Sequence, residues 1–183
     1  MLFQYLVFGL LILIFCQMSP MPFYRKSLEY QIIAISTGSS KASLSTTMKV
    51  CTDNLGISDT STSFVLPLGA SINMDGTAIK LGLAALFVAQ VMGMELSMMD
   101  YFVMILTSTI GSIGAAGIPG AFMVMLPMVL SSINLPIEAV ALFAGVDRLL
   151  DLLSTTINIT GDATITLIVD NSEGNLDKDK YYS

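Results

Sequence analysis

The chain divides into long apolar runs separated by short polar segments. Apolar residues fill positions 1–17 and dominate 62–94, 101–133 and 135–169. A helix needs roughly 17 to 25 such residues to cross the hydrocarbon core of a bilayer. The first run lacks a basic start and a small-residue cleavage site, which favours a membrane helix over a signal peptide. The pattern therefore predicts an all-α integral membrane protein.

Three regions of the chain, 20–57, 62–94 and 101–133, are interrupted near their middle, by STGSSKAS, NMDGT and GSIGAAGIPG. Non-helical backbone at membrane depth is tolerated only where protein buries it or where it lines a cavity. Helix ends placed there attract anions at free N–H groups and cations at free carbonyls, as in transporters. The predicted segments are a transmembrane helix (1–17), a first hairpin (20–57), a broken transmembrane helix (62–94), a second hairpin (97–133), a transmembrane helix (135–170) and a polar tail (171–183).

Composition narrows the function classes. Hydrophobic residues make up 54% of the 183 residues and charged residues 12%, against about a quarter charged in soluble domains. The absence of histidine excludes a histidine general base, a Ser-His-Asp triad and the commonest zinc sites. Eight basic residues, a net charge of −6 and no basic stripe argue against a nucleic-acid partner. Cys16 and Cys51 have neither metal-site nor disulfide spacing.

The segment DRLLDLLSTTINITGD (147–162) carries polar residues inside an apolar run. At the helical period, six of them fall within an arc of about 100° on one face, with Arg148 at its edge. Internal pairing that only holds helices together is one interpretation. Unpaired charge at mid-membrane is costly, so three carboxylates against one arginine favour a visiting cation. The six residues are Asp147, Asp151, Ser154, Thr155, Asn158 and Asp162.

The segment NMDGT (73–77) combines an amide, a thioether, a carboxylate and a hydroxyl with a glycine that can open a helix. A kink capped by Asn73 and Asp75 would explain these residues taken alone. Their place between two polar hairpins favours a cation site. An oxygen-rich ligand set without a dense carboxylate cage suits a monovalent cation, and sodium is the natural candidate.

The two remaining interruptions each leave alternatives open. GSIGAAGIPG does not follow a strand, which excludes a phosphate loop, and it is either a helix-packing face or an unwound tip. Pro119 and the regular glycines favour the tip. STGSSKAS is either a polar loop or a Ser/Lys nucleophile pair, but Gly38 occupies the serine position of the usual Ser-x-x-Lys spacing.

In this order, the serine-rich tip, PLGASINMDGT, GSIGAAGIPGA and DRLLDLLSTTINITGD resemble the dicarboxylate/amino acid:cation (sodium) symporter family, which includes glutamate transporter homologues. The resemblance runs from about Met1 to Gly174. It implies an eight-span fold with two re-entrant hairpins, acting as a homotrimer by an elevator motion in the cell inner or plasma membrane. The chain would be the C-terminal transport half, without the scaffold spans and the third span.

The resemblance also implies roles for individual residues. Asp151 would receive the substrate ammonium group, while Asn158 and the first tip would hold its α-carboxylate. The implied substrate-binding residues are Ser39, Ser40, Thr77, Ile118 through its backbone, Asp151, Ser154, Thr155 and Asn158. The implied sodium ligands form three sets: Gly69, Asn73, Asn158 and Asp162; Asn73 and Asp75, completed by the third span; and Ser71, Met74 and the carbonyls of Ser112, Ile113 and Ala115.

Four residues depart from the family pattern. Ser154 stands where acidic-substrate members carry an arginine, and Lys41, Lys80 and Phe122 replace a serine, a commoner neutral residue and a small residue. These departures concern the substrate more than the mechanism. We therefore expect a non-enzymatic symporter that couples an amino acid or dicarboxylate to sodium, without another cofactor. The alternatives are a non-transporting remnant of such a symporter and an intramembrane Ser/Lys hydrolase.

Overall fold

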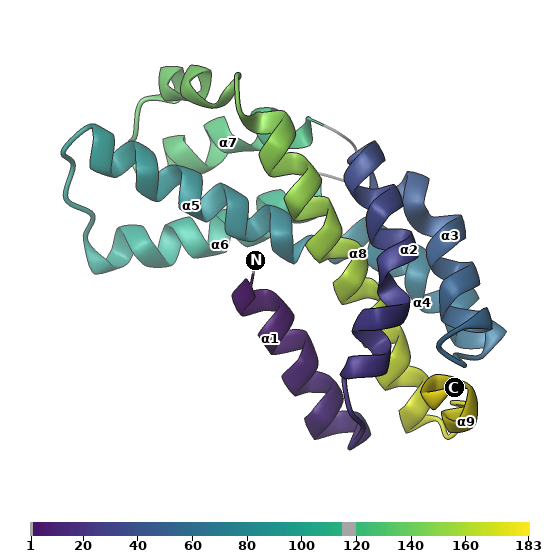
Figure 1. The fold of residues 1–183 in the computed structure, drawn as a ribbon. Coiled ribbons are helices and arrows are strands. Elements are labelled where there is room, and N and C mark those ends of the chain that lie inside the picture. Colours follow the sequence, from purple (N-terminus) through teal and green to yellow (C-terminus); the bar gives the residue numbers. More distant parts are fainter. Residues whose placement is uncertain (1, 115–119) are drawn as a thin grey trace.

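The computed structural model describes residues 2–114 and 120–183, and every regular element in these ranges is helical. The all-α prediction is confirmed. The elements are α1 (Leu2–Leu11), the π-helical turn η1 (Ile12–Cys16), α2 (Met21–Thr37), α3 (Ser40–Asp53), α4 (Asp59–Ile72), α5 (Asp75–Val91), α6 (Met98–Gly114), α7 (Ala121–Ser132), the 3-10 helix η2 (Ile137–Phe143), α8 (Asp147–Ser172) and α9 (Lys178–Tyr182). Figure 1 shows α8 passing between two groups of helices, α2 to α4 and α5 to α7.

Two pairs of consecutive helices form hairpins. Helices α2 and α3 pack together and are joined at Gly38, whose φ of +65° is accessible to glycine at little steric cost. The Ser39 hydroxyl then caps α3 by accepting a hydrogen bond from the Ala42 amide. Helices α6 and α7 also pack together, and their connection at 115–119 lies outside the described residues. A packed pair of helices thus lies in each of the two regions, and the re-entrant hairpins stay a prediction.

The predicted break at NMDGT is present. Helix α4 ends at Ile72, and α5 begins at Asp75, so Asn73 and Met74 alone separate them. Their backbones leave the helical region, with ψ of 92° and 43°. By length and composition, the broken helix from Asp59 to Val91 could cross a membrane. The break therefore exposes helix ends within an otherwise apolar segment.

Helix α8 is the second helix long and apolar enough to cross a membrane within the described residues. It packs against α2, α3, α4 and α5. The sequence predicts one helix over 135–170, but the structure has a separate 3-10 helix and α8 begins only at Asp147. The reason is tertiary packing: Phe143, at the end of η2, stacks edge-on against Phe87 and Phe122, so the chain must turn before α8.

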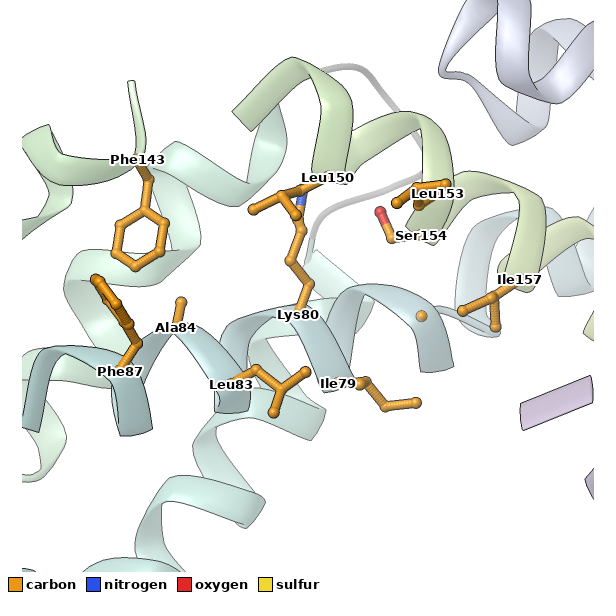
Figure 2. A pocket seen from close by; sticks show the side chains of 11 residues that line it. Ile79, Lys80, Leu83, Ala84, Phe87, Phe143, Leu150, Leu153, Ser154 and Ile157 are labelled. Atoms are coloured by element: carbon orange, nitrogen blue, oxygen red, sulfur yellow. The ribbon is translucent and has the colours of Figure 1, made fainter. Parts of the chain in front are cut away.

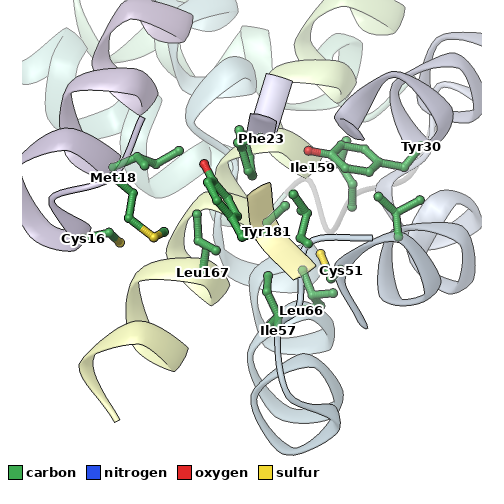
Figure 3. Packing of buried hydrophobic residues seen from close by; sticks show 14 of the residues in the cluster. Cys16, Met18, Phe23, Tyr30, Cys51, Ile57, Leu66, Ile159, Leu167 and Tyr181 are labelled. Atoms are coloured by element: carbon green, nitrogen blue, oxygen red, sulfur yellow. The ribbon is translucent and has the colours of Figure 1, made fainter. Parts of the chain in front are cut away.

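Two apolar clusters lie on either side of α8. The first joins α2, α3, α4 and the second half of α8, and Figure 3 shows Ile159 and Leu167 of α8 within it. The second joins α5, α6, α7 and η2, with Leu150 at its edge. Many large apolar side chains point outward instead, including Leu6 and Phe64. This distribution suits a surface covered by lipid or by further protein.

The polar tail folds back onto the first cluster. Tyr181 of α9 is fully buried, and Figure 3 shows its ring among Met18, Phe23 and Leu167. Burial raises the pKa of the Tyr181 hydroxyl, which donates a hydrogen bond to the Ser19 carbonyl at 2.8 Å. Near the base of the first hairpin, the Lys26 ammonium donates to the carbonyls of Asn54, Lys180 and Tyr181. The tail is therefore part of the folded core.

We expect Tyr181→Ala to lower the free energy of unfolding by about 3 to 5 kcal/mol, because it empties an aromatic site in the first cluster. Tyr181→Phe keeps the ring and removes only the hydrogen bond to Ser19, so it should cost about 1 kcal/mol. Denaturant titration of both variants in detergent would measure the difference. Equal, small losses would show that α9 does not pack there.

Candidate functional site

The polar face of α8 is buried from Asp151 to Asp170, and the helix breaks converge on it. The break between α4 and α5 contacts α8 through Asn73, Gly76 and Thr77. The two hairpins contact it near its N-terminal end, through Thr37 and Gly120. Free amide groups and carbonyls from several helix ends thus surround a row of polar side chains, as in sites that bind both anions and cations.

Asp162 is a residue of α8 that lies against the C-terminal end of α4. Its side chain is 1% exposed, and its Oδ1 accepts a hydrogen bond from the Asn73 Nδ2 at 2.9 Å. Its Oδ2 has no hydrogen-bond partner in the described part of the chain. A buried carboxylate oxygen without a partner is costly, and a bound cation would remove that cost. A cavity of about 230 Å³, lined in part by Gly69, Asn73 and Asp162, adjoins it.

Two glycines allow α4 and the helix break to lie close to α8 at Asp162. A Cβ atom on Gly69 would lie 2.6 Å from the Asp162 Oδ1, and one on Gly161 would lie 2.8 Å from the Asn73 Nδ2. Neither separation leaves room for a methyl group. The Gly69 carbonyl already accepts the Asn73 amide at 2.8 Å and retains a second lone pair. The structure thus brings together the first predicted sodium set, Gly69, Asn73, Asn158 and Asp162.

Asn158 fastens the NMDGT segment to α8. Its Oδ1 accepts the Gly76 amide at 2.8 Å, while its Nδ2 donates to the Thr77 hydroxyl at 3.1 Å and to the Met74 sulfur at 3.2 Å. Both amide protons are therefore used within the protein. A substrate carboxylate could bind Asn158 only by replacing one of these bonds.

The other predicted sodium ligands are less closely grouped. Asp75 accepts hydrogen bonds from the Gly76 amide and from Gln4 of α1. Met74 is buried at the break and Ser71 is exposed near the end of α4. Ser112 is buried in α6 and Ile113 is exposed. The remaining predicted ligand, Ala115, and the substrate contact Ile118 lie outside the described residues.

Asp151, the predicted acceptor of the substrate ammonium, already has a cationic neighbour. The Lys80 Nζ lies 3.0 Å from its Oδ1 and 3.3 Å from the Asp147 Oδ1. The other Asp151 oxygen accepts the Gly120 amide at 3.3 Å. Internal pairing therefore explains two of the three acids on this face, and Asp162 differs from them. The sequence could have indicated that Lys80 faces the site, because Lys80 follows the predicted substrate contact Thr77 by three residues and so shares its helix face.

Ser154 and Thr155 are buried near this ion pair. Ser154 lines a cavity of about 220 Å³ together with Gly76 and Lys80, and its hydroxyl donates to the Asp151 carbonyl of its own helix. Figure 2 shows the Lys80 side chain pointing from α5 toward α8, with Ser154 beside it. Apolar side chains form most of the remaining wall. Among the described residues that line this cavity, Lys80 is the single cationic side chain.

The tip of the first hairpin lies against the start of α8. The Arg148 guanidinium donates to the Thr37 carbonyl at 3.2 Å, and a Cβ on Gly38 would lie 2.8 Å from its Nη1. The Ser40 hydroxyl is buried without a hydrogen-bond partner in the described ranges, whereas Lys41 is exposed. Arg148 is therefore a further cation near the predicted carboxylate-binding tip. Helical spacing alone placed it only at the edge of the polar face.

Comparison with known proteins identifies the group to which these features belong. The model of the sodium:dicarboxylate symporter family matches residues 1–172. The chain belongs to this family. It is 44% identical to an excitatory amino acid transporter of Caenorhabditis elegans over 79% of this chain and 29% of that protein. It is 40% identical to the putative sodium-dependent excitatory amino acid transporter glt-4 of the same organism, over 91% of this chain and 33% of that protein.

A human relative gives the same result. The chain is 43% identical to excitatory amino acid transporter 1 of Homo sapiens over 86% of its length and 29% of the human protein. The chain thus spans about a third or less of the length of these curated relatives. The predicted membership of the sodium symporter family is confirmed, and the family consists of membrane transporters.

The close approach of α4 to Asp162 can be tested with two glycines. Gly69→Ala should lower the free energy of unfolding by about 1 to 3 kcal/mol, since its methyl group would overlap the Asp162 carboxylate. Gly82→Ala is the matched control, because its Cβ would meet only the Ser108 hydroxyl oxygen, at 3.8 Å. That change should be neutral or stabilising by up to about 1 kcal/mol. Denaturant titration in detergent measures both, and a neutral Gly69→Ala would contradict this packing.

Proposed function

We propose that this chain carries the substrate- and cation-binding helices of a sodium-coupled amino acid symporter. The observation that carries the proposal is the buried Asp162, whose Oδ2 lacks a partner beside the break between α4 and α5. Family membership supports the same function, and one relative is named as a putative sodium-dependent transporter. In this proposal, sodium binds at Asp162 and the amino acid binds near Asp151.

The donor set around Asp162 favours sodium over a divalent metal. One carboxylate and the carbonyls of Gly69 and Asn158 are hard oxygen ligands of low total charge, and the Asn73 amide, whose nitrogen now donates to Asp162 and Asn158, would add its oxygen on rotating. Within residues 2–114 and 120–183, there is no group of three or more acidic or cysteine side chains that could hold a metal ion. The C-terminal end of α4 adds partial negative charge at the same point.

The substrate site combines both signs of charge. Asp151 would accept the substrate ammonium group, and the N-terminal end of α3, at Ser39 and Ser40, would bind its α-carboxylate. Thr77, Thr155 and the backbone of Ile118 would complete the pocket. The second and third sodium sets, at Asp75 and at Met74 with the second hairpin, belong to the same proposal.

Ser154 determines which side chain the pocket accepts. Its neutral hydroxyl offers one hydrogen bond, whereas an arginine would bind a carboxylate through two charge-assisted bonds. Lys41 is exposed on α3 and is not among the described residues that line the cavity beside Ser154, so in this proposal it does not supply the missing charge. We therefore propose a neutral or hydroxylated amino acid as the substrate.

The wider architecture follows from the family. We propose that the two helical hairpins are re-entrant, that the broken helix and α8 cross the membrane, and that the whole protein is a homotrimer in the cell inner or plasma membrane. The segments 1–17, 20–57, 62–94, 97–133 and 135–170 would be the corresponding membrane units. Lipid, sodium and the amino acid are its proposed partners.

Two alternatives have less support. A Ser/Lys hydrolase would need Lys41 to activate a serine, but Lys41 is exposed while the Ser40 hydroxyl is buried without a hydrogen-bond partner in the described residues. A non-transporting remnant would retain the helices without a working sodium site. Sodium binding at Asp162 separates the proposed symporter from such a remnant.

Replacing sodium by choline should abolish amino acid uptake by the full-length protein in proteoliposomes, and equal uptake in choline would contradict the proposal.

Asp162→Asn should weaken sodium binding more than about tenfold, because it removes a charged ligand. Asp59→Asn is the matched control, since Asp59 is exposed in the first turn of α4 and should leave the affinity unchanged. Sodium titration by calorimetry measures all three proteins, and equal affinities would refute the assignment.

Ser154→Arg should turn selectivity toward aspartate and glutamate, because the new guanidinium can bind a second substrate carboxylate. Ser154→Gln adds similar bulk without charge and should not favour acidic substrates. Competition of alanine, serine, aspartate and succinate against labelled substrate measures the preference. An unchanged series in Ser154→Arg would show that position 154 does not face the substrate side chain.

A further inference from the structure

Three residues that depart from the family pattern are far apart in sequence and meet around Asp151. Lys80 forms an ion pair with Asp151, and its Nζ lies 4.2 Å from the centre of the Phe122 ring. Ser154, one turn along α8, lines the same cavity as Lys80. A residue from α5, one from α7 and one from α8 therefore change the surroundings of a single carboxylate.

The Lys80 ammonium is held on several sides. Two carboxylates lie within 3.3 Å of it, and the Phe122 ring covers another side. The residue is only 7% exposed. A cation over an aromatic face gains attraction that grows as water is excluded. To bind a substrate carboxylate, Lys80 would have to leave two negative charges uncompensated in a buried site, which is costly.

Four charged side chains around Asp151 and the first hairpin tip sum to zero net charge. Asp147 and Asp151 contribute two negative charges, and Lys80 and Arg148 contribute two positive charges. Arg148 is exposed and lies at the first hairpin tip, where a substrate carboxylate is proposed to bind, so its charge would act at the other end of the substrate. A zwitterion adds no net charge to this set. An acidic amino acid adds one negative charge without a partner.

We infer that Lys80 is a specificity-determining residue, whose fixed ammonium compensates one of the two carboxylates at the amino end of the pocket and so selects amino acids with uncharged side chains. The inference rests on the proposed function and assigns its substrate selectivity to a further residue. Lys80 acts as a resident counter-charge and not as a ligand for a substrate carboxylate. The second carboxylate stays available to the substrate ammonium group.

Opposite changes of charge should shift selectivity in opposite directions. Lys80→Met keeps most of the side-chain volume and leaves one surplus negative charge, so L-lysine should gain at least about tenfold in affinity relative to L-alanine. Asp147→Asn leaves one surplus positive charge, so L-aspartate should gain similarly. Asp147 lies in the first turn of α8, and asparagine has nearly the same size and shape, so the helix should still form.

Equilibrium competition binding on purified protein in nanodiscs, with sodium present, measures these ratios without requiring transport. Lys80→Arg keeps the charge and should retain the wild-type order. Lys49→Met removes a lysine from the exposed side of α3 and should also retain it. A shift toward L-lysine in Lys80→Met, or toward L-aspartate in Asp147→Asn, with both controls unchanged, supports the inference, and either variant suffices if the other does not fold.

Two results would overturn the inference while leaving sodium-coupled amino acid binding intact. One is an unchanged selectivity series in Lys80→Met and Asp147→Asn. The other is wild-type protein that prefers L-aspartate and loses this preference in Lys80→Met, which would make Lys80 the ligand of the substrate carboxylate. Absence of sodium-dependent binding of all three amino acids to the wild type would instead refute the proposed function, and the inference with it.

Discussion

A carboxylate held away from water is stable only among cations or hydrogen-bond donors, and α8 carries several of them along its buried length. Each is met by a different part of the chain. Lys80 of α5 pairs with Asp151, Asn73 at the helix break donates to Asp162, and the Ser58 amide and hydroxyl, at the start of α4, donate to Asp170. The acids of α8 therefore tie α5, the helix break and the start of α4 to defined points along this helix.

The fold class and the helix breaks could be predicted from sequence because they depend on local composition. Apolar runs specify helices, and NMDGT places asparagine and glycine where a helix cannot continue without cost. The grouping of Asn73, Asn158 and Asp162 was also predictable, but only through the resemblance to a known family. Helical spacing within α8 placed Asn158 and Asp162 on one face, and nothing in that spacing could place Asn73 opposite them.

Features that arise from contacts between distant segments could not be predicted in this way. The ion pair of Lys80 with Asp147 and Asp151 depends on how α5 crosses α8, and the edge-on packing of Phe143 shortens α8 at its start. The tail looked like a solvated end because charged and polar residues dominate its composition. Burial of the Tyr181 ring and the hydrogen bonds from Lys26 to the tail carbonyls dock it nevertheless.

The docking of Tyr181 has a consequence for biosynthesis. The first cluster joins Ile12 to Tyr181, so it contains members that are far apart in the sequence, and Tyr181 is synthesised after all the others. Until residue 181 has been made, Met18, Phe23 and Leu167 lack an aromatic neighbour, and the cluster stays incomplete in the membrane. Contacts of such long sequence separation form slowly. Truncations shortly before residue 181 should therefore impair assembly of helices synthesised much earlier, and quality-control proteases would act on that intermediate.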